Sequence, residues 1–240
     1  MPAAMGRNRR VCFHYAEISS GEFLAIGTGS YRDMPYSRGQ VDNPTPDEAL
    51  AILIEGNNRY LDDTIAPMDY SAARAAAVEE HSPVAAILGC GDARVATELI
   101  FDRGPGDLFM VRLAGNFLSD YGLASMEYCV EFLDTPLLVV LGHTGCGAVT
   151  SAVRVVANKE DLPGRLFVLI DALEPSVLRA QMANPDDLIL AAIEENVHRQ
   201  VRRLRTISPV INAALAAGTV KVVGAIYEME TGRVRIIDAD

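Results

Sequence analysis

Two short motifs in the chain combine residue types that can bind a metal ion and activate water. The first is Cys90-Gly91-Asp92-Ala93-Arg94, and the second is His143-Thr144-Gly145-Cys146. Two cysteines and one histidine form a soft ligand set that suits zinc. Three protein ligands leave the fourth corner of a tetrahedron free for water, as in catalytic zinc sites. Because zinc acidifies a bound water, the pattern predicts a hydrolase or a hydratase.

Asp92 and Arg94 are the residues that we expect beside this metal ion. Paired with Arg94, the Asp92 carboxylate stays ionised and can accept a hydrogen bond from a zinc-bound hydroxide. Released from Arg94, the same carboxylate could instead bind the metal as a fourth ligand and close the site. The motif is compatible with both the open and the closed arrangement.

Two other interpretations of the cysteines compete with a catalytic zinc site. A structural zinc site is one of them, but such sites usually have four Cys or His ligands in two close pairs. A redox pair is the other, but Cys90 and Cys146 lack the C-x-x-C spacing. The remaining cysteines, Cys12 and Cys129, are expected to be small hydrophobic residues. The catalytic zinc site is therefore the leading interpretation.

Each motif follows a segment that is typical of a buried parallel strand. These segments, 83–88 and 137–141, are short, apolar and bounded by Pro or Gly. Ligands of open α/β sheets bind beyond the carboxyl ends of the strands, so the two motifs should converge there. A helical pattern resumes after His143 and runs to about residue 158. If the helix begins at His143, that residue and Cys146 lie on the same side of it, and its N-terminus favours a thiolate.

Strands and helices alternate along the rest of the chain. This alternation predicts an α/β fold with a mainly parallel central sheet flanked by helices. The helix over 46–61 has a strong start, because Thr45 and Glu48 form a capping box and Pro46 suits its first position. The other expected strands are 108–113, 220–227 and 233–237, and the other expected helices are 70–81, 121–133 and 186–205.

The length, charge and apolar content limit the class of protein. The chain has 240 residues, half of them hydrophobic, which is enough for one sizeable α/β domain. We assign that domain to residues 44–240 and an irregular N-terminal arm to residues 1–43. A net charge of −11 argues against nucleic acid and anionic membranes as partners.

The sequence also predicts a cytoplasmic location. No apolar run reaches the roughly 18 residues of a membrane span. The segment 11–20 contains His14, Glu17 and two serines, so it does not match the apolar core of a signal peptide. Reduced cysteines, as expected at a metal site, are typical of the same compartment.

At these motifs the chain resembles the β-class carbonic anhydrases, over about residues 45–237. Beyond the two ligand motifs, several segments carry the family's pattern. They are Glu55–Tyr60, Pro105–Phe109, Arg112 with Ala114–Asn116, Leu141–Ala148, Asn196–Val197 with Gln200, and Gly224–Tyr227 followed by Thr231–Gly232.

The resemblance implies reversible hydration of carbon dioxide to bicarbonate and a proton by a zinc-bound hydroxide. It implies Zn²⁺ on Cys90, His143 and Cys146, with Asp92 and Arg94 as the catalytic pair. It also implies a sheet of four parallel strands with a further strand at the edge. The family's unit is a homo-oligomer, a dimer or larger, with its active sites at the subunit interface.

The resemblance also identifies substrate-pocket positions and departures from the family pattern. Tyr128 falls where the family often has a tyrosine lining the apolar pocket. His81 stands nine residues before the first Cys ligand, where many members have a Gln that reaches the partner subunit's site. The imidazole could donate a hydrogen bond and relay protons, or it could merely tolerate the geometry. Leu113 replaces a common Asn, and Ile87 replaces the Trp of the bicarbonate-inhibited subset, which favours the open site.

Two other functions fit the same motifs. The first is hydrolysis of carbon disulfide or carbonyl sulfide, which are linear molecules like carbon dioxide, by the same fold and zinc ion. The second is a non-catalytic, zinc-binding regulatory paralogue, which the changes at His81 and Leu113 leave open.

Overall fold

The computed structural model describes residues 44–65, 67–79 and 82–239 of the chain. The helices in these ranges are α1 (Pro46–Leu61), α2 (Tyr70–Glu79), α3 (Thr97–Ile100), α4 (Asp120–Phe132), α5 (Gly147–Asn158), α6 (Leu166–Met182), α7 (Leu188–Ile207) and α8 (Pro209–Ala216). The strands are β1 (Ala85–Gly89), β2 (Leu108–Arg112), β3 (Leu137–His143), β4 (Lys221–Tyr227) and β5 (Val234–Asp238). None of the described helices is both long enough and apolar enough to cross a membrane.

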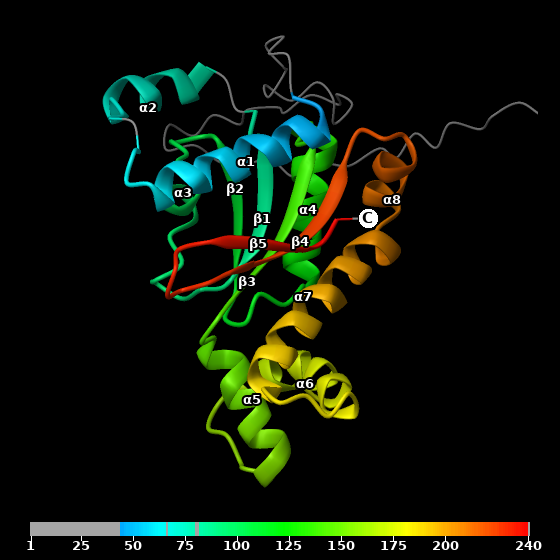
Figure 1. The fold of residues 1–240 in the computed structure, drawn as a ribbon. Helices are drawn as coiled ribbons and strands as arrows, with labels where there is room; N and C mark the ends of the chain where they lie inside the picture. Colours follow the sequence, from blue (N-terminus) through cyan, green and yellow to red (C-terminus); the bar gives the residue numbers. More distant parts are fainter. Residues whose placement is uncertain (1–43, 66, 80–81, 240) are drawn as a thin grey trace, which may run out of the picture.

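The strands form one sheet in the order β2-β1-β3-β4-β5 (Figure 1). The first four strands in this order pair in parallel, and β5 pairs antiparallel with β4 at the edge. Every residue of β1 and β3 is buried, which explains why their sequences are continuous apolar runs. The structure therefore confirms the predicted α/β fold of four parallel strands and one edge strand.

Helices cover both faces of this sheet. α1 and α3 lie on one face, where Leu53 and Ile100 pack against Ile87 and Val139. α4 and α7 lie on the other face, where the buried cluster includes Met126 from α4. α5 and α6 pack against α7 beyond the carboxyl ends of the parallel strands (Figure 1). The predicted metal-binding motifs thus lie between the carboxyl ends of the strands and the helices α5 and α6.

The segment that connects β3 to α5 differs from the prediction. β3 continues through His143, which pairs with Tyr227 of β4, and α5 begins only at Gly147. Cys146 is the N-cap of α5 and has extended backbone angles. The condition for His143 and Cys146 to share one helical face, a helix that begins at His143, is therefore not met, because the ladder to β4 extends β3 by two residues. Gly145, with a φ of +65°, turns the chain between the strand and the helix.

Three helices were not predicted from the sequence, and two regions lie outside the described residues. α6 contains Pro175, which interrupts its helical pattern, whereas α3 and α8 are short. The predicted helix over 70–81 is described as α2 up to Glu79, so His81 lies outside the described residues. The predicted N-terminal arm, residues 1–43, also lies outside them.

α1 is fixed at its start by its cap and near its end by a close backbone contact. The Thr45 amide donates to the Glu48 carboxylate, and the Glu48 amide donates to the Thr45 hydroxyl, which confirms the predicted capping box. Near the other end, a Cβ atom on Gly56 would lie 1.9 Å from the carbonyl oxygen of Phe101. Because Gly56 has no Cβ atom, α1 can approach the end of α3 closely enough to bury Leu53.

Replacing Gly56 with alanine should therefore destabilise the fold. Alanine is a better helix former than glycine by about 1 kcal/mol, but overpacking against a fixed backbone costs typically about 1–3 kcal/mol and more here. We expect G56A to lower the free energy of unfolding in a denaturant titration followed by circular dichroism. E55A, at the exposed neighbouring position, should unfold like the wild type. A G56A protein as stable as the wild type would show that α1 and α3 do not approach this closely.

Candidate metal centre

Three potential metal ligands meet at the carboxyl ends of β1 and β3. Cys90 directly follows β1, His143 ends β3, and Cys146 caps α5. All three side chains are buried, and one ligand atom from each lies within 4.8 Å of the others. The two sulfur atoms are 4.0 Å apart. Two sulfurs bound to one tetrahedral zinc ion at about 2.3 Å would be separated by about 3.8 Å, so the spacing fits such an ion.

The histidine is oriented so that one ring nitrogen is free to bind a metal. His143 Nδ1 lies 3.0 Å from the carbonyl oxygen of Thr144, and a carbonyl can only accept a hydrogen bond. Nδ1 therefore carries the hydrogen, and Nε2 keeps its lone pair. Nε2 is buried and has no hydrogen-bond partner among the described residues. A buried polar atom without a partner is costly, and a metal ion would satisfy it.

A hydrogen bond between the two cysteines shifts their pKa values in opposite directions. The Cys146 thiol donates to the Cys90 sulfur, and mainly for this reason the pKa of Cys90 falls to about 4 despite its burial. The same hydrogen bond raises the pKa of Cys146 far above its usual range. The Gly115 amide also donates to the Cys90 sulfur at 3.3 Å. Both cysteines would bind a divalent cation as thiolates, so metal binding would release the thiol protons.

Beside the ligands, Asp92 and Arg94 form a two-point ion pair. Arg94 Nε lies 3.0 Å from Asp92 Oδ1, and Arg94 Nη2 lies 2.8 Å from Oδ2. The Arg94 side chain, followed by the Arg94 amide, holds the pKa of Asp92 well below its usual range. Asp92 Oδ2 also lies 4.0 Å from His143 Nε2, so an ionised carboxylate borders the metal position. In this structure the carboxylate is paired with Arg94.

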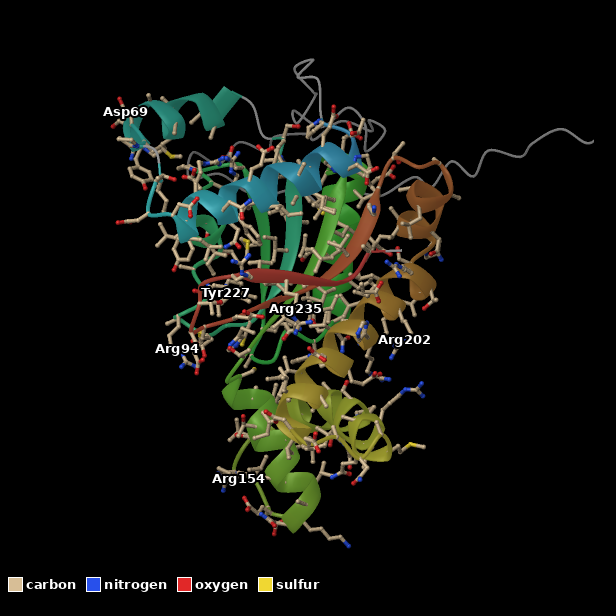
Figure 2. The ribbon with its side chains drawn as sticks, viewed as in Figure 1. Asp69, Arg94, Arg154, Arg202, Tyr227 and Arg235 are labelled. Carbon is tan, nitrogen blue, oxygen red and sulfur yellow. The ribbon has the colours of Figure 1, made fainter. Side chains whose placement is uncertain are left out.

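Arg112, at the end of β2, fixes the backbone of the first motif. Its guanidinium donates to the carbonyl of Cys90 at 3.0 Å and to that of Asp92 at 2.7 Å. The backbone of Leu113 adds two bonds, from its N–H to Gly89 and from the Gly91 N–H to its carbonyl. Replacing the family's common Asn with Leu113 therefore leaves these backbone contacts in place. Figure 2 shows Arg94 at the same end of the sheet as Tyr227, the residue opposite His143.

Of the other residues that the sequence analysis named, Tyr128 and Ile87 lie in the core, and His81 lies outside the described residues. Tyr128 packs between Phe109 and Phe132, with ring centroids 6.3 and 5.1 Å away, against the core that includes Cys90. Ile87 is fully buried in β1 on the face covered by α1. His81 is outside the described residues, so its place relative to the site stays a prediction.

Sequence reasoning did not assign three contacts that orient the ligands. They come from the Thr144 carbonyl, the Gly115 amide and the Arg112 guanidinium. Gly115 and Arg112 stand in segments that resemble the family, but a motif alone does not show which atom a residue contacts. Thr144 contributes through its backbone, so its residue type carried no signal.

Comparisons with known proteins agree on one family. The family model described as carbonic anhydrase matches residues 85–234. A carbonic anhydrase of Mycolicibacterium smegmatis is 36% identical over 199 residues, covering 81% of this chain and 94% of that protein. Carbonic anhydrase 2 of Mycobacterium tuberculosis is 37% identical over 204 residues, covering 82% of this chain and 95% of that protein.

Solved structures give the same result. The β-carbonic anhydrase CcaA superposes with a TM-score of 0.60 at 29% identity, covering 79% of this chain and 95% of that chain. The Coccomyxa β-carbonic anhydrase, solved in complex with acetazolamide, has a TM-score of 0.59 at 28% identity and covers 78% of this chain and 86% of that chain.

The ligand cluster predicts which cysteines are needed for metal binding. We expect C146S to lose more than about 100-fold in zinc affinity, because removal of a ligand should exceed the 10–100-fold loss typical of an outer-shell partner. Cys129 is equally buried, but its thiol donates to the Met126 carbonyl, so C129S should keep one zinc per chain. Zinc can be quantified by mass spectrometry after dialysis against a chelator. Equal zinc retention by both variants would exclude the proposed ligand set.

The exposed Arg94 side chain predicts a separation between activity and stability. The R94Q variant should unfold at nearly the wild-type midpoint, because 63% of the Arg94 side chain is accessible to solvent. Its carbon dioxide hydration rate should nevertheless fall by about 10-fold or more, because Asp92 loses the partner that orients it.

R154Q is a matched control for this experiment. Arg154 on α5 is 66% exposed and pairs with Glu160, and it lies away from the sheet (Figure 2). This variant should be as stable and as active as the wild type. Loss of activity in both variants, or in neither, would contradict the assigned role of Arg94.

Proposed function

Because this chain belongs to the β-class carbonic anhydrase family, we propose that it catalyses the reversible hydration of carbon dioxide to bicarbonate and a proton at the Cys90–His143–Cys146 cluster. One observation carries the assignment of the site. Two sulfur atoms lie within 4.8 Å of a buried imidazole nitrogen that has no hydrogen-bond partner among the described residues, and an ionised carboxylate borders this cluster. This arrangement has the ligands and the neighbouring acceptor that hydration requires.

We propose zinc as the metal ion of this site. Two thiolates and one imidazole form a soft donor set, and three ligands leave a position for water. Zinc bound here would lower the pKa of a coordinated water from about 15.7 toward 7 and so supply hydroxide at neutral pH. The two thiolates neutralise the charge of a divalent ion, so the surrounding hydrogen bonds gain importance.

We assign Asp92 the role of an oriented hydrogen-bond acceptor. The Arg94 fork keeps this carboxylate ionised and fixes both of its oxygens. An ionised carboxylate can only accept hydrogen bonds, so Oδ2 can accept a hydrogen bond from the hydroxide. This hydrogen bond would direct a lone pair of the hydroxide oxygen toward the substrate carbon. The Arg112 contacts to the Cys90 and Asp92 carbonyls hold this loop in register.

The proposed substrate pocket and assembly follow from the family assignment. Carbon dioxide is apolar, and Tyr128 lies among aromatic side chains that suit such a molecule. We propose that the partner subunit's His81 supplies a hydrogen bond or a proton path to the site. Self-association agrees with the edge strand β2, which pairs only with β1 among the described residues.

The D92N variant tests this mechanism. Asparagine keeps the size of the side chain but cannot take up the same charge-assisted pair with Arg94. We expect zinc content to stay at one per chain and the turnover of carbon dioxide to fall by about 10²–10³-fold, as when one oriented hydrogen-bond group of an active site is removed. Stopped-flow hydration between about pH 6.5 and 9, with zinc quantified in the same sample, measures both.

D69N controls for the loss of one negative charge. Asp69 accepts the Ser71 and Ala72 amides at the start of α2, and asparagine caps a helix as well as aspartate. This variant should hydrate carbon dioxide at the wild-type rate. Full activity of D92N, or hydration by a zinc-free wild-type sample, would refute the mechanism.

A further inference from the structure

The loop that follows β2 places a backbone amide on the Cys90 sulfur. The Gly115 N–H donates to Cys90 Sγ at 3.3 Å within the buried core. Gly115 has a φ of +80°, and a Cβ atom there would lie 2.9 Å from Leu173 and 3.2 Å from Ala148. A side chain at this position would be strained, so the turn requires glycine. Because glycine has a flexible backbone, the direction of its N–H depends on the hydrogen bonds of the neighbouring peptides.

Asn196 of α7 holds the peptide on the other side of Gly115. Its Nδ2 donates to the Gly115 carbonyl at 2.9 Å, and the side chain is fully buried. Its Oδ1 accepts hydrogen bonds from Gln200 Nε2 at 2.9 Å and from Ser176 Oγ at 3.4 Å. Since Oδ1 has these two donors, the amide is fixed with Nδ2 toward Gly115.

The same face of α7 holds the other end of the loop. Gln200 Oε1 accepts the Leu118 amide at 3.2 Å, and Arg203 Nη1 donates to the Leu118 carbonyl at 2.7 Å. Arg203 Nη1 also donates to Gln200 Oε1 at 3.2 Å. Asn196, Gln200 and Arg203 are spaced by four and three residues, so they form one row along the helix. Hydrogen bonds thus link this row to the Gly115 carbonyl. The backbone of Gly115 itself joins that carbonyl to the amide on the Cys90 sulfur.

A hydrogen bond to a thiolate withdraws charge from the sulfur and weakens its donation to a bound metal. Such outer-shell contacts change metal affinity or activity by about 10–100-fold, and hydrogen bonds to sulfur tune other thiolate-bound metal centres. We propose that Asn196 is a positioning residue of the metal centre, which holds the Gly115 amide on the Cys90 sulfur and so sets the charge that this ligand donates. The inference rests on the metal site of the proposed function and is independent of the substrate.

The N196L variant, loaded with cobalt(II), tests this inference. Leucine has nearly the same size as asparagine, but it cannot hold the Gly115 carbonyl. A sulfur freed from its hydrogen bond is a stronger donor, so the thiolate-to-cobalt charge-transfer band should move to longer wavelength. The rate of zinc transfer to a chelator should also change by about 10-fold. N196D, measured at a pH where its carboxylate is ionised, serves as a second variant if N196L does not fold, because an ionised carboxylate cannot donate to Gly115.

L204A separates positioning from a general loss of stability. Leu204 is fully buried on the same helix and belongs to the apolar core rather than to the polar row. This variant should lower the unfolding midpoint and leave the cobalt band unchanged. An unchanged band in N196L and N196D, or the same shift in L204A, would overturn the role of Asn196. A wild-type protein that binds cobalt and zinc but does not hydrate carbon dioxide would refute the proposed function, while the band would still decide this inference.

Discussion

The parallel pairing of β1 with β3 is the constraint on which the metal centre depends. Gly89 lies opposite Leu141, so the chain delivers Cys90 one residue beyond this pair and His143 two residues beyond it. A shift of one residue between the strands would move these ligands by about 3.3 Å. Metal–ligand distances tolerate only about 0.2 Å, so such a shift would take the ligand atoms out of the spacing that this structure shows. The fully buried, apolar strands thus set the geometry of the polar site at their ends.

The charges at the site are balanced locally, within a chain that is negative overall. In a protein with a net charge of −11, the site brings the Cys90 sulfur and the Asp92 carboxylate into a small volume. Two arginines balance them in different ways. Arg94 pairs with a carboxylate and orients it. Within the part of the chain that the structure describes, Arg112 donates to the Cys90 and Asp92 carbonyls and so fixes the loop. A divalent cation completes this balance because it compensates both thiolates.

The strands and the ligands could be predicted from the sequence because their signals are local. An apolar run bounded by Pro or Gly identifies β1, and Cys or His residues directly after such runs identify the cluster. The end of β3 could not be predicted, since residues 142 and 143 are strand only because β4 continues beside them. The contact of Asn196 with Gly115 was equally inaccessible, because it joins residues 81 positions apart through the packing of α7.

The polar row of α7 follows from the burial of an irregular loop. The segment 115–118 has backbone groups inside the core that no strand or helix pairs, and each such group must find a partner or destabilise the fold. Asn196, Gln200 and Arg203 supply these partners, so apolar residues in their place would leave the Gly115 carbonyl and the Leu118 amide unpaired. The satisfied loop has its Gly115 amide directed at Cys90. The contacts that make the loop stable are therefore the same ones that hold the peptide next to the Cys90 sulfur.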